Sequence, residues 1–318
     1  MSAGVSLDSV EHHIEVPGGR VWAKVTNPGS PGTPLIALHG GPGFPSYYLE
    51  PLNALAAQRP VVLYDQLGCG RSDRPDDPSL WRIERFALEL DSVLAALGYS
   101  RYHVYGHSWG TMLATHFVTR HGSARVRSII MSSPGLQIDW WERDCNALID
   151  TLSESARSAI RAANASGDFS GADYEAATAE FYGRYVCKHG MSTPEFQETI
   201  AGAGLAVYHK IQGPNEFTVA GDMKGWDFTD DLPRLAVPVL YLTGAEDEAR
   251  PDTVARFATL TPDSRMVVIR DAAHLTTLDN PKASNAAIAA FLDEVDAQPP
   301  SERGVRGETR RSAAYGIR

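Results

Sequence analysis

Short apolar segments alternate with amphipathic segments along the first part of the chain. Residues 10–16 and 20–26 flank a Pro-Gly-Gly sequence, which predicts a β-hairpin. Residues 48–58 and 83–97 are expected to be helices, and the second has apolar side chains at helical spacing and ends at Gly98. Buried strands of a parallel sheet are rich in apolar and β-branched residues, and four further segments have this composition: 34–38, 61–64, 102–105 and 126–131. The alternation predicts an α/β fold with helices on both faces of the sheet.

The pattern changes near Ser133. From there to about residue 211 only helical spacing is present, and it predicts four helices: 140–152, 153–163, 172–185 and 194–210. Strand-like segments return at residues 237–242 and 265–269, and a last helix is expected over residues 281–295. Together with the earlier segments they predict an eight-stranded, mostly parallel sheet.

An all-helical insertion inside an α/β chain is best interpreted as a cap over one edge of the sheet. We therefore expect a core in two parts, residues 1–133 and 229–296, and a helical cap over residues 134–228. Residues 297–318 contain five arginines against two glutamates and have little apolar surface to bury, so we expect a mobile tail.

Composition and charge narrow the class of protein. The 318-residue chain has a net charge of −10, which argues against a nucleic-acid partner and is compatible with a soluble enzyme. No apolar run approaches the roughly 20 residues that span a bilayer, and residues 1–10 lack the basic and apolar regions of a secretory signal. The odd number of scattered cysteines, Cys69, Cys145 and Cys187, indicates free thiols. We expect a cytoplasmic enzyme, whose oligomeric state the sequence does not predict.

Ser108 stands in the sequence Gly-His-Ser-Trp-Gly, between a predicted strand and residues 111–118, which have helical spacing. A glycine two residues to either side of a serine allows the sharp turn of a nucleophile elbow. Such a turn exposes the hydroxyl at the sheet edge and directs the N-terminus of the next helix at a developing oxyanion. The alternative is an ordinary turn with a helix-capping serine, but the strand before and the helix after favour a nucleophile.

A serine hydroxyl needs a base and an orienting acid, and in a parallel sheet such groups meet on loops after the carboxyl ends of the strands. Of the ten histidines, His274 is the one that follows a late strand in the expected place, whereas His107 is expected to point away from the serine. Three consecutive acidic residues, 246–248, follow the preceding strand, and all remain candidates. Asp247 is favoured by its spacing from Gly244.

An oxyanion formed on the serine would need two hydrogen-bond donors. The backbone N–H of Trp109, directly after the serine, is one candidate. The second is expected from the sequence His-Gly-Gly-Pro-Gly at residues 39–43, where we choose Gly41, although a simple tight turn is the alternative. Neither His-Glu-x-x-His nor a pair of Cys-x-x-Cys motifs occurs, so no metal and no cofactor is predicted.

Three motifs together resemble the prolyl aminopeptidases, also called proline iminopeptidases, and especially the branch of the tricorn-interacting aminopeptidase. They are His-Gly-Gly-Pro-Gly at 39–43, Asp-Gln-Leu-Gly-Cys-Gly-Arg-Ser at 65–72 and Gly-His-Ser-Trp-Gly at 106–110. The resemblance extends to Gly-Pro-Asn-Glu-Phe-Thr-Val at 213–219 and to Trp-Asp at 226–227, and it covers about residues 10–292. It implies the α/β-hydrolase fold with an inserted helical cap and the activity of a serine peptidase.

The resemblance also implies two substrate-binding residues. In such enzymes a cap glutamate and the glutamate after the catalytic aspartate bind the free α-ammonium group of the substrate, and here these positions are Glu216 and Glu248. A cationic amine that enters a closed pocket needs compensating carboxylates, because its desolvation is otherwise prohibitive. A solvated surface acid or a loop-capping group is the alternative for Glu216.

We therefore expect a serine hydrolase that cleaves an amide bond and releases one N-terminal amino acid with a free α-amine, through an acyl-enzyme on Ser108. The substrate would be a peptide, a simple aminoacyl amide or, as for some relatives, a macrolactam polyketide intermediate that carries an aminoacyl protecting group. A carboxylester hydrolase with the same three residues is a further hypothesis. A non-catalytic receptor on this fold would be expected to lack part of the machinery.

Overall fold

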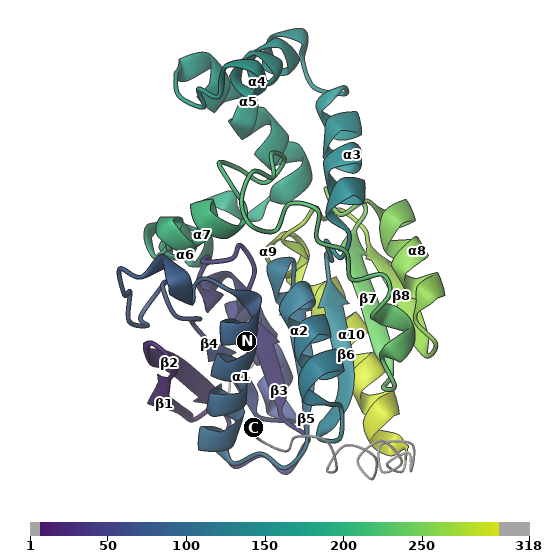
Figure 1. The fold of residues 1–318 in the computed structure, drawn as a ribbon. Helices are drawn as coiled ribbons and strands as arrows, with labels where there is room; N and C mark the ends of the chain where they lie inside the picture. The colour runs from purple at the N-terminus through teal and green to yellow at the C-terminus, as the bar shows by residue number, and fades with distance from the viewer. Residues whose placement is uncertain (1–6, 299–318) are drawn as a thin grey trace, which may run out of the picture.

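A computed structural model describes residues 7–298 of the chain. Its centre is one sheet in the order β1-β2-β4-β3-β5-β6-β7-β8 (Figure 1). The strands are β1 (Ser9–Val16), β2 (Gly19–Thr26), β3 (Leu35–Leu38), β4 (Val61–Tyr64), β5 (Tyr102–His107), β6 (Val126–Ser132), β7 (Val239–Gly244) and β8 (Ser264–Ile269). β1 pairs antiparallel with β2, and β2 antiparallel with β4, while all later neighbours are parallel. The predicted eight-stranded, mostly parallel sheet is confirmed.

The central strands are the most apolar part of the chain, and every residue of β3, β4, β5 and β7 is buried. Helices exclude water from both faces of the sheet. α1 packs against α2 in front of the sheet in Figure 1. α10 lies behind the sheet and packs against η1. These and the other core helices are η1 (Ser46–Ala57), η2 (Pro78–Leu80), α1 (Ile83–Leu97), α2 (Trp109–His121), η5 (Leu232–Arg234), α8 (Pro251–Leu260), α9 (Thr276–Asp279) and α10 (Pro281–Ala297).

The segment between β6 and β7 contains helices and no strand of the sheet. Figure 1 shows α3, α4 and α5 projecting above the carboxyl ends of the strands, with α6 and α7 closer to the sheet. The segment comprises α3 (Ile138–Ile149), α4 (Glu154–Ser166), α5 (Ala172–Phe181), the π-helical turn η3 (Tyr182–Val186), η4 (Gly190–Ser192), α6 (Pro194–Ala201) and α7 (Leu205–Ile211).

Two predicted helices differ from the structure. The helix expected over residues 194–210 is interrupted between α6 and α7, because the chain bends there against two loops of the core. Gly202 accepts a hydrogen bond from the N–H of Gly70, and the N–H of Gly204 donates to Gly43 at 2.7 Å. The helix expected over residues 48–58 is a 3₁₀-helix that contains Pro51, which lacks the N–H of a regular α-helical ladder.

Within residues 7–298, no helix is both long enough and apolar enough to cross a membrane. The three cysteines are buried free thiols. The predicted tail, residues 297–318, lies almost entirely outside the described part of the chain.

Candidate active site

Ser108 lies in the turn between β5 and α2, and its backbone is strained. Its φ of 51° and ψ of −118° are unusual for a residue with a side chain. The glycines on either side are sterically required. A Cβ atom at Gly106 would lie 2.5 Å from the carbonyl oxygen of Gly110, and one at Gly110 would lie 2.2 Å from the carbonyl oxygen of Leu38 in β3. The packing of β5, α2 and β3 therefore holds the serine in the conformation of a nucleophile elbow.

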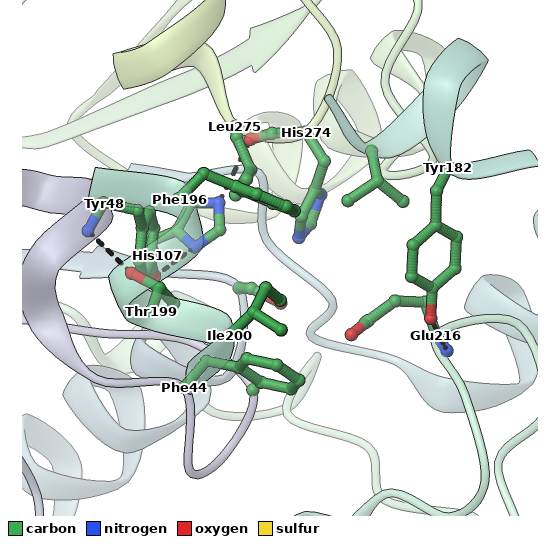
Figure 2. Close-up of a pocket in the computed structure, with 13 residues that line it drawn as sticks. Phe44, Tyr48, His107, Tyr182, Phe196, Thr199, Ile200, Glu216, His274 and Leu275 are labelled. Atoms are coloured by element: carbon green, nitrogen blue, oxygen red, sulfur yellow. Dashed lines mark hydrogen bonds between the residues drawn. The ribbon is translucent and has the colours of Figure 1, made fainter. Parts of the chain in front are cut away.

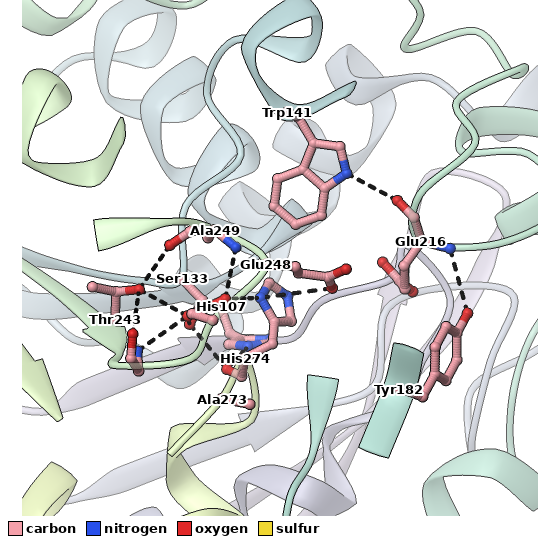
Figure 3. Close-up of polar contacts among 12 residues, drawn as sticks. His107, Ser133, Trp141, Tyr182, Glu216, Thr243, Glu248, Ala249, Ala273 and His274 are labelled. Atoms are coloured by element: carbon pink, nitrogen blue, oxygen red, sulfur yellow. Dashed lines mark hydrogen bonds and ion pairs between the residues drawn. The ribbon is translucent and has the colours of Figure 1, made fainter. Parts of the chain in front are cut away.

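His274 and Asp247 lie on the loops that follow β8 and β7, and the structure brings them into contact. Nδ1 of His274 is 2.8 Å from Oδ1 of Asp247, and both side chains are buried (Figure 3). Because a carboxylate only accepts hydrogen bonds, this contact places the ring proton on Nδ1 and leaves the other nitrogen, Nε2, free to accept a proton.

Asp247 is held as an anion by its surroundings. Its Oδ2 accepts hydrogen bonds from the hydroxyls of Ser133 and Thr243 at 2.6 and 2.9 Å and from the N–H of Gly244, and its Oδ1 also accepts from the N–H of Ala249. Burial by itself would raise the pKa of this carboxyl, but the nearby His274 charge and these donors lower it below its usual value. Of the three acidic residues 246–248, only Asp247 contacts the imidazole at hydrogen-bond distance.

Ser108 and His274 border the same pocket. Nε2 of His274 is buried and has no hydrogen-bond partner within the described residues, so the serine–histidine hydrogen bond is not formed in this structure. In unliganded enzymes such contacts are often long and shorten when the substrate binds. Ser108, His274 and Asp247 thus lie close together, and the hydrogen bond between His274 and Asp247 is formed.

Gly41 and Trp109 lie beside the serine and border a second, smaller pocket with it. Gly41 has a φ of 107°, and a Cβ atom there would lie 2.8 Å from the N–H nitrogen of Phe44, so only glycine fits. Trp109 is the first residue of α2, where backbone N–H groups have no partner in the helix. Gly41 and Trp109 therefore lie on two different segments that meet beside Ser108.

Glu216 lies on the segment that returns from α7 to the core. The hydroxyl of Tyr208 donates to its Oε1 at 2.9 Å. The indole N–H of Trp141 donates to its backbone carbonyl, and the hydroxyl of Tyr182 accepts from its backbone N–H (Figure 3). Its carboxylate borders both pockets next to Ser108. Burial raises the pKa of this carboxyl, and His274 and the Tyr208 hydrogen bond oppose the increase.

Glu248 is fully buried, and neither of its carboxylate oxygens has a hydrogen-bond partner within the described residues. Its Oε1 is 3.9 Å from Nδ1 of His274, and Figure 3 shows its carboxylate directed toward Glu216. Burial, followed by the charges of Glu216 and Asp247, raises its pKa well above the usual value. The two glutamates are thus close enough for the charge of Glu216 to act on the carboxyl group of Glu248.

The π-helical turn η3 contacts the loops of both Glu248 and His274. The sequence pattern predicts one helix over residues 172–185 and does not reveal this turn. The carbonyl of Tyr185 accepts hydrogen bonds from the N–H groups of both Glu248 and His274, each at 3.2 Å, and the carbonyl of Val186 accepts from Leu275. π-Helical turns are frequent at functional sites. Here the turn fixes the backbones of the acidic pair and of the histidine relative to each other.

His107 is predicted to point away from Ser108, and this stays a prediction, but the residue is also part of the pocket lining. Its ring borders the larger pocket, and its centroid lies 4.7 Å from that of His274 (Figure 2). Nε2 is 3.1 Å from the carbonyl of His274, Nδ1 is 2.8 Å from the hydroxyl of Tyr48, and that hydroxyl accepts from the N–H of Gly40. His107 therefore connects the loop of the candidate base with the glycine-rich loop.

The tautomer of His107 follows from these partners. A carbonyl only accepts, so Nε2 carries the proton and Nδ1 accepts from Tyr48. Burial, with the charge of His274 as the next cause, lowers its pKa to about 3. We predict that ¹⁵N NMR shows a neutral His107 with the proton on Nε2 at every pH between about 5 and 8. Titration in this range, or a proton on Nδ1, would contradict the assignment.

The sequence was compared with known families and proteins, and the fold with solved structures. Residues 33–281 match the family described as the alpha/beta hydrolase fold. The chain is 39% identical to the proline iminopeptidase of Heyndrickxia coagulans over 287 residues, which cover 90% of this chain and 99% of that protein. It is 34% identical to the proline iminopeptidase of Levilactobacillus brevis, over 84% of this chain and 91% of that one.

Two crystal structures resemble the whole described fold. The proline iminopeptidase of Mycobacterium smegmatis superimposes with a TM-score of 0.84 at 35% identity, and VinJ with a TM-score of 0.86 at 30% identity. Each alignment covers 90% of this chain and 99% of the other. The chain therefore belongs to the proline iminopeptidase family of alpha/beta hydrolases.

Proposed function

We propose that this protein is a serine aminopeptidase that hydrolyses the amide bond after a single N-terminal residue with a free α-amine. The observation that carries the proposal is the buried, unpartnered carboxylate of Glu248, directed toward Glu216 beside Ser108. Burial raises the pKa of both carboxyl groups, and neighbouring carboxyl groups with perturbed pKa values are typical of a functional site. The names of its relatives support the same activity.

Ser108 is the nucleophile in this proposal. Nε2 of His274 removes the hydroxyl proton as Oγ attacks the amide carbon, and Asp247 orients the ring and stabilises the imidazolium. The protonated histidine then donates to the departing amine, and the acyl-enzyme remains. A water molecule, activated by the same Nε2, hydrolyses the ester and restores the serine. The hydrogen bond between His274 and Asp247 supports these roles.

The N–H groups of Gly41 and Trp109 form the proposed oxyanion hole. Their positions beside the serine are fixed by the glycine-rich loop and by the start of α2. Backbone donors that are already oriented stabilise the tetrahedral intermediate without reorganisation, and this is commonly the largest electrostatic contribution to acyl transfer.

Glu216 and Glu248 bind the α-ammonium group in this proposal. Residues 134–228 act as a cap, and Glu216 comes from its last segment, after α7. With the ammonium held beside the serine, only the first carbonyl of a chain reaches Oγ, which explains release of one residue. The side chain of that residue would enter the smaller pocket, which Ser108 also borders. Met112, Ile138, Trp141 and Met223 are among its lining residues, so a small apolar side chain such as that of proline or alanine fits best.

The buried carboxylate gives a first kinetic prediction. Glu248→Gln should lower kcat/KM for aminoacyl substrates with a free amine by about 30- to 5000-fold, the equivalent of about 2–5 kcal/mol of transition-state binding. p-Nitrophenyl esters without an amine should be hydrolysed at nearly the wild-type rate. Glu246→Gln is the matched control, because Glu246 is half-exposed and pairs with Lys188 on the surface. Equal losses on both substrate types would instead favour the carboxylester-hydrolase hypothesis.

The raised pKa of Glu248 gives a second prediction, on proton release. In the free protein this carboxyl keeps its proton at a pH where an exposed glutamate has lost it. A bound ammonium group favours the ionised carboxylate, so binding lowers the pKa and releases a proton. The affinity of Ser108→Ala for alaninamide should therefore increase with pH from about 5, until the amine itself deprotonates near pH 8.

The measurement is calorimetric titration of alaninamide in two buffers of different ionisation enthalpy. Proton release should be found with Ser108→Ala and should be reduced or absent when Glu248→Gln is added, which separates it from titration of His274. The same proton release in both proteins would contradict the assignment to Glu248.

A further inference from the structure

The two pockets beside Ser108 divide the substrate between them. His274 borders only the larger of the two, and in the proposed mechanism it must give its proton to the departing amine. The departing group therefore lies in the larger pocket.

The larger pocket presents apolar side chains from four different segments (Figure 2). Phe44 comes from the glycine-rich loop, Val186 from the end of η3, Phe196 and Ile200 from α6, and Leu275 from the residue after His274. Ile200 is 49% exposed and lies where the pocket meets solvent. A departing group that extends past the serine therefore contacts mainly apolar side chains.

Most polar groups of this lining are already satisfied. The hydroxyl of Tyr48 accepts from Gly40 and donates to His107, and the second nitrogen of His107 donates to the carbonyl of His274. The hydroxyl of Thr199 donates to the carbonyl of Glu195 and accepts from the N–H of Tyr48. These groups are not free to replace the water lost by a polar departing group, and an unreplaced hydrogen bond is unfavourable.

The lining also contains no lysine or arginine, and its one acidic residue is Glu216. A dipeptide would bring a free carboxylate into this pocket without a cation to pair with, close to an anionic site. A longer peptide would bring backbone N–H and C=O groups that need partners. An alkyl or aryl amine, by contrast, would bury apolar surface and leave no polar group unpaired.

We propose that the preferred substrates are aminoacyl amides of apolar amines, and that the pocket formed by Phe44, Val186, Phe196, Ile200 and Leu275 binds the departing amine. This inference rests on the proposed function and names its substrate class. It concerns the departing amine, which the two glutamates do not contact. Peptides with a polar or charged second residue are poor substrates on this account.

The test is a series of alanyl amides with one acyl group and amines of nearly equal basicity: methylamine, butylamine, hexylamine and 6-aminohexanoate. Equal basicity keeps the chemical step constant, so the series reports contact with the pocket. A fully buried methylene contributes a factor of about 4, and with partial burial kcat/KM should increase at least about 30-fold from methyl to hexyl. The 6-aminohexanoate amide, with a terminal carboxylate, should fall back to about the methyl value.

Ile200→Asp places a charge at the mouth of the pocket, and Leu88→Asp is its matched control. Both residues are helical and similarly exposed, at 49% and 47%, but Leu88 lies on α1 and does not border the pocket. The hexyl-to-methyl ratio of kcat/KM should fall below about 3 in Ile200→Asp and stay at the wild-type value in Leu88→Asp. Because the ratio is internal to each protein, a partly unfolded variant does not obscure it.

A hexyl-to-methyl ratio near 1 in the wild type, with both amides cleaved, would overturn the inference and leave the aminopeptidase proposal intact. Faster cleavage of the 6-aminohexanoate amide than of the hexylamide would also overturn it. If Ser108→Ala were as active as the wild type, or if no alanyl amide were cleaved while esters were, the proposed function itself would fail.

Discussion

The central constraint on the candidate site is a pair of neighbouring glutamates, Glu216 and Glu248, with no lysine or arginine paired to either within the described residues. Glu248 is fully buried and unpartnered, and its pKa is raised by burial and by the negative groups next to it. A carboxyl group in such a position keeps its proton, because an unpaired buried charge is unfavourable. A bound ammonium group would instead favour the ionised carboxylate. In the proposed function, this change of protonation makes the site selective for cationic amines.

The surrounding structure keeps the other groups rigid around this pair. Hydrogen bonds from four residues hold Asp247, and Tyr185 holds the backbones of Glu248 and His274 with one carbonyl. His107 also restricts the site, because its neutral ring connects the His274 loop with the glycine-rich loop through Tyr48. Precise placement of this kind is what proton transfer and oxyanion stabilisation require. The contacts that hold Tyr48 and His107 also use up their polar atoms, so few polar groups of the larger pocket remain free. This is the feature on which the proposed preference for an apolar departing amine rests.

Much of the fold could be predicted from sequence, because apolar strands and helical spacing are local signals. The positions of Ser108, Asp247 and His274 directly after β5, β7 and β8 could also be predicted, since parallel strands place their following loops at one edge of the sheet. Contacts between residues far apart in the sequence leave no local pattern and could not be predicted. The interruption between α6 and α7 depends on contacts of Gly202 and Gly204 with loops more than a hundred residues away, and the role of His107 depends on Tyr48 and on a carbonyl of a late loop. Glu216 was identified through a family resemblance, since a single glutamate in a loop carries no pattern of its own.

The measurement that tests the account most directly is a crystal structure of Ser108→Ala with an uncleaved alanyl amide bound. The account predicts that the α-ammonium nitrogen lies within hydrogen-bond distance of carboxylate oxygens of both Glu216 and Glu248, with the amide carbonyl oxygen directed at the N–H groups of Gly41 and Trp109. An ammonium group that faces solvent, or that contacts neither glutamate, would contradict it.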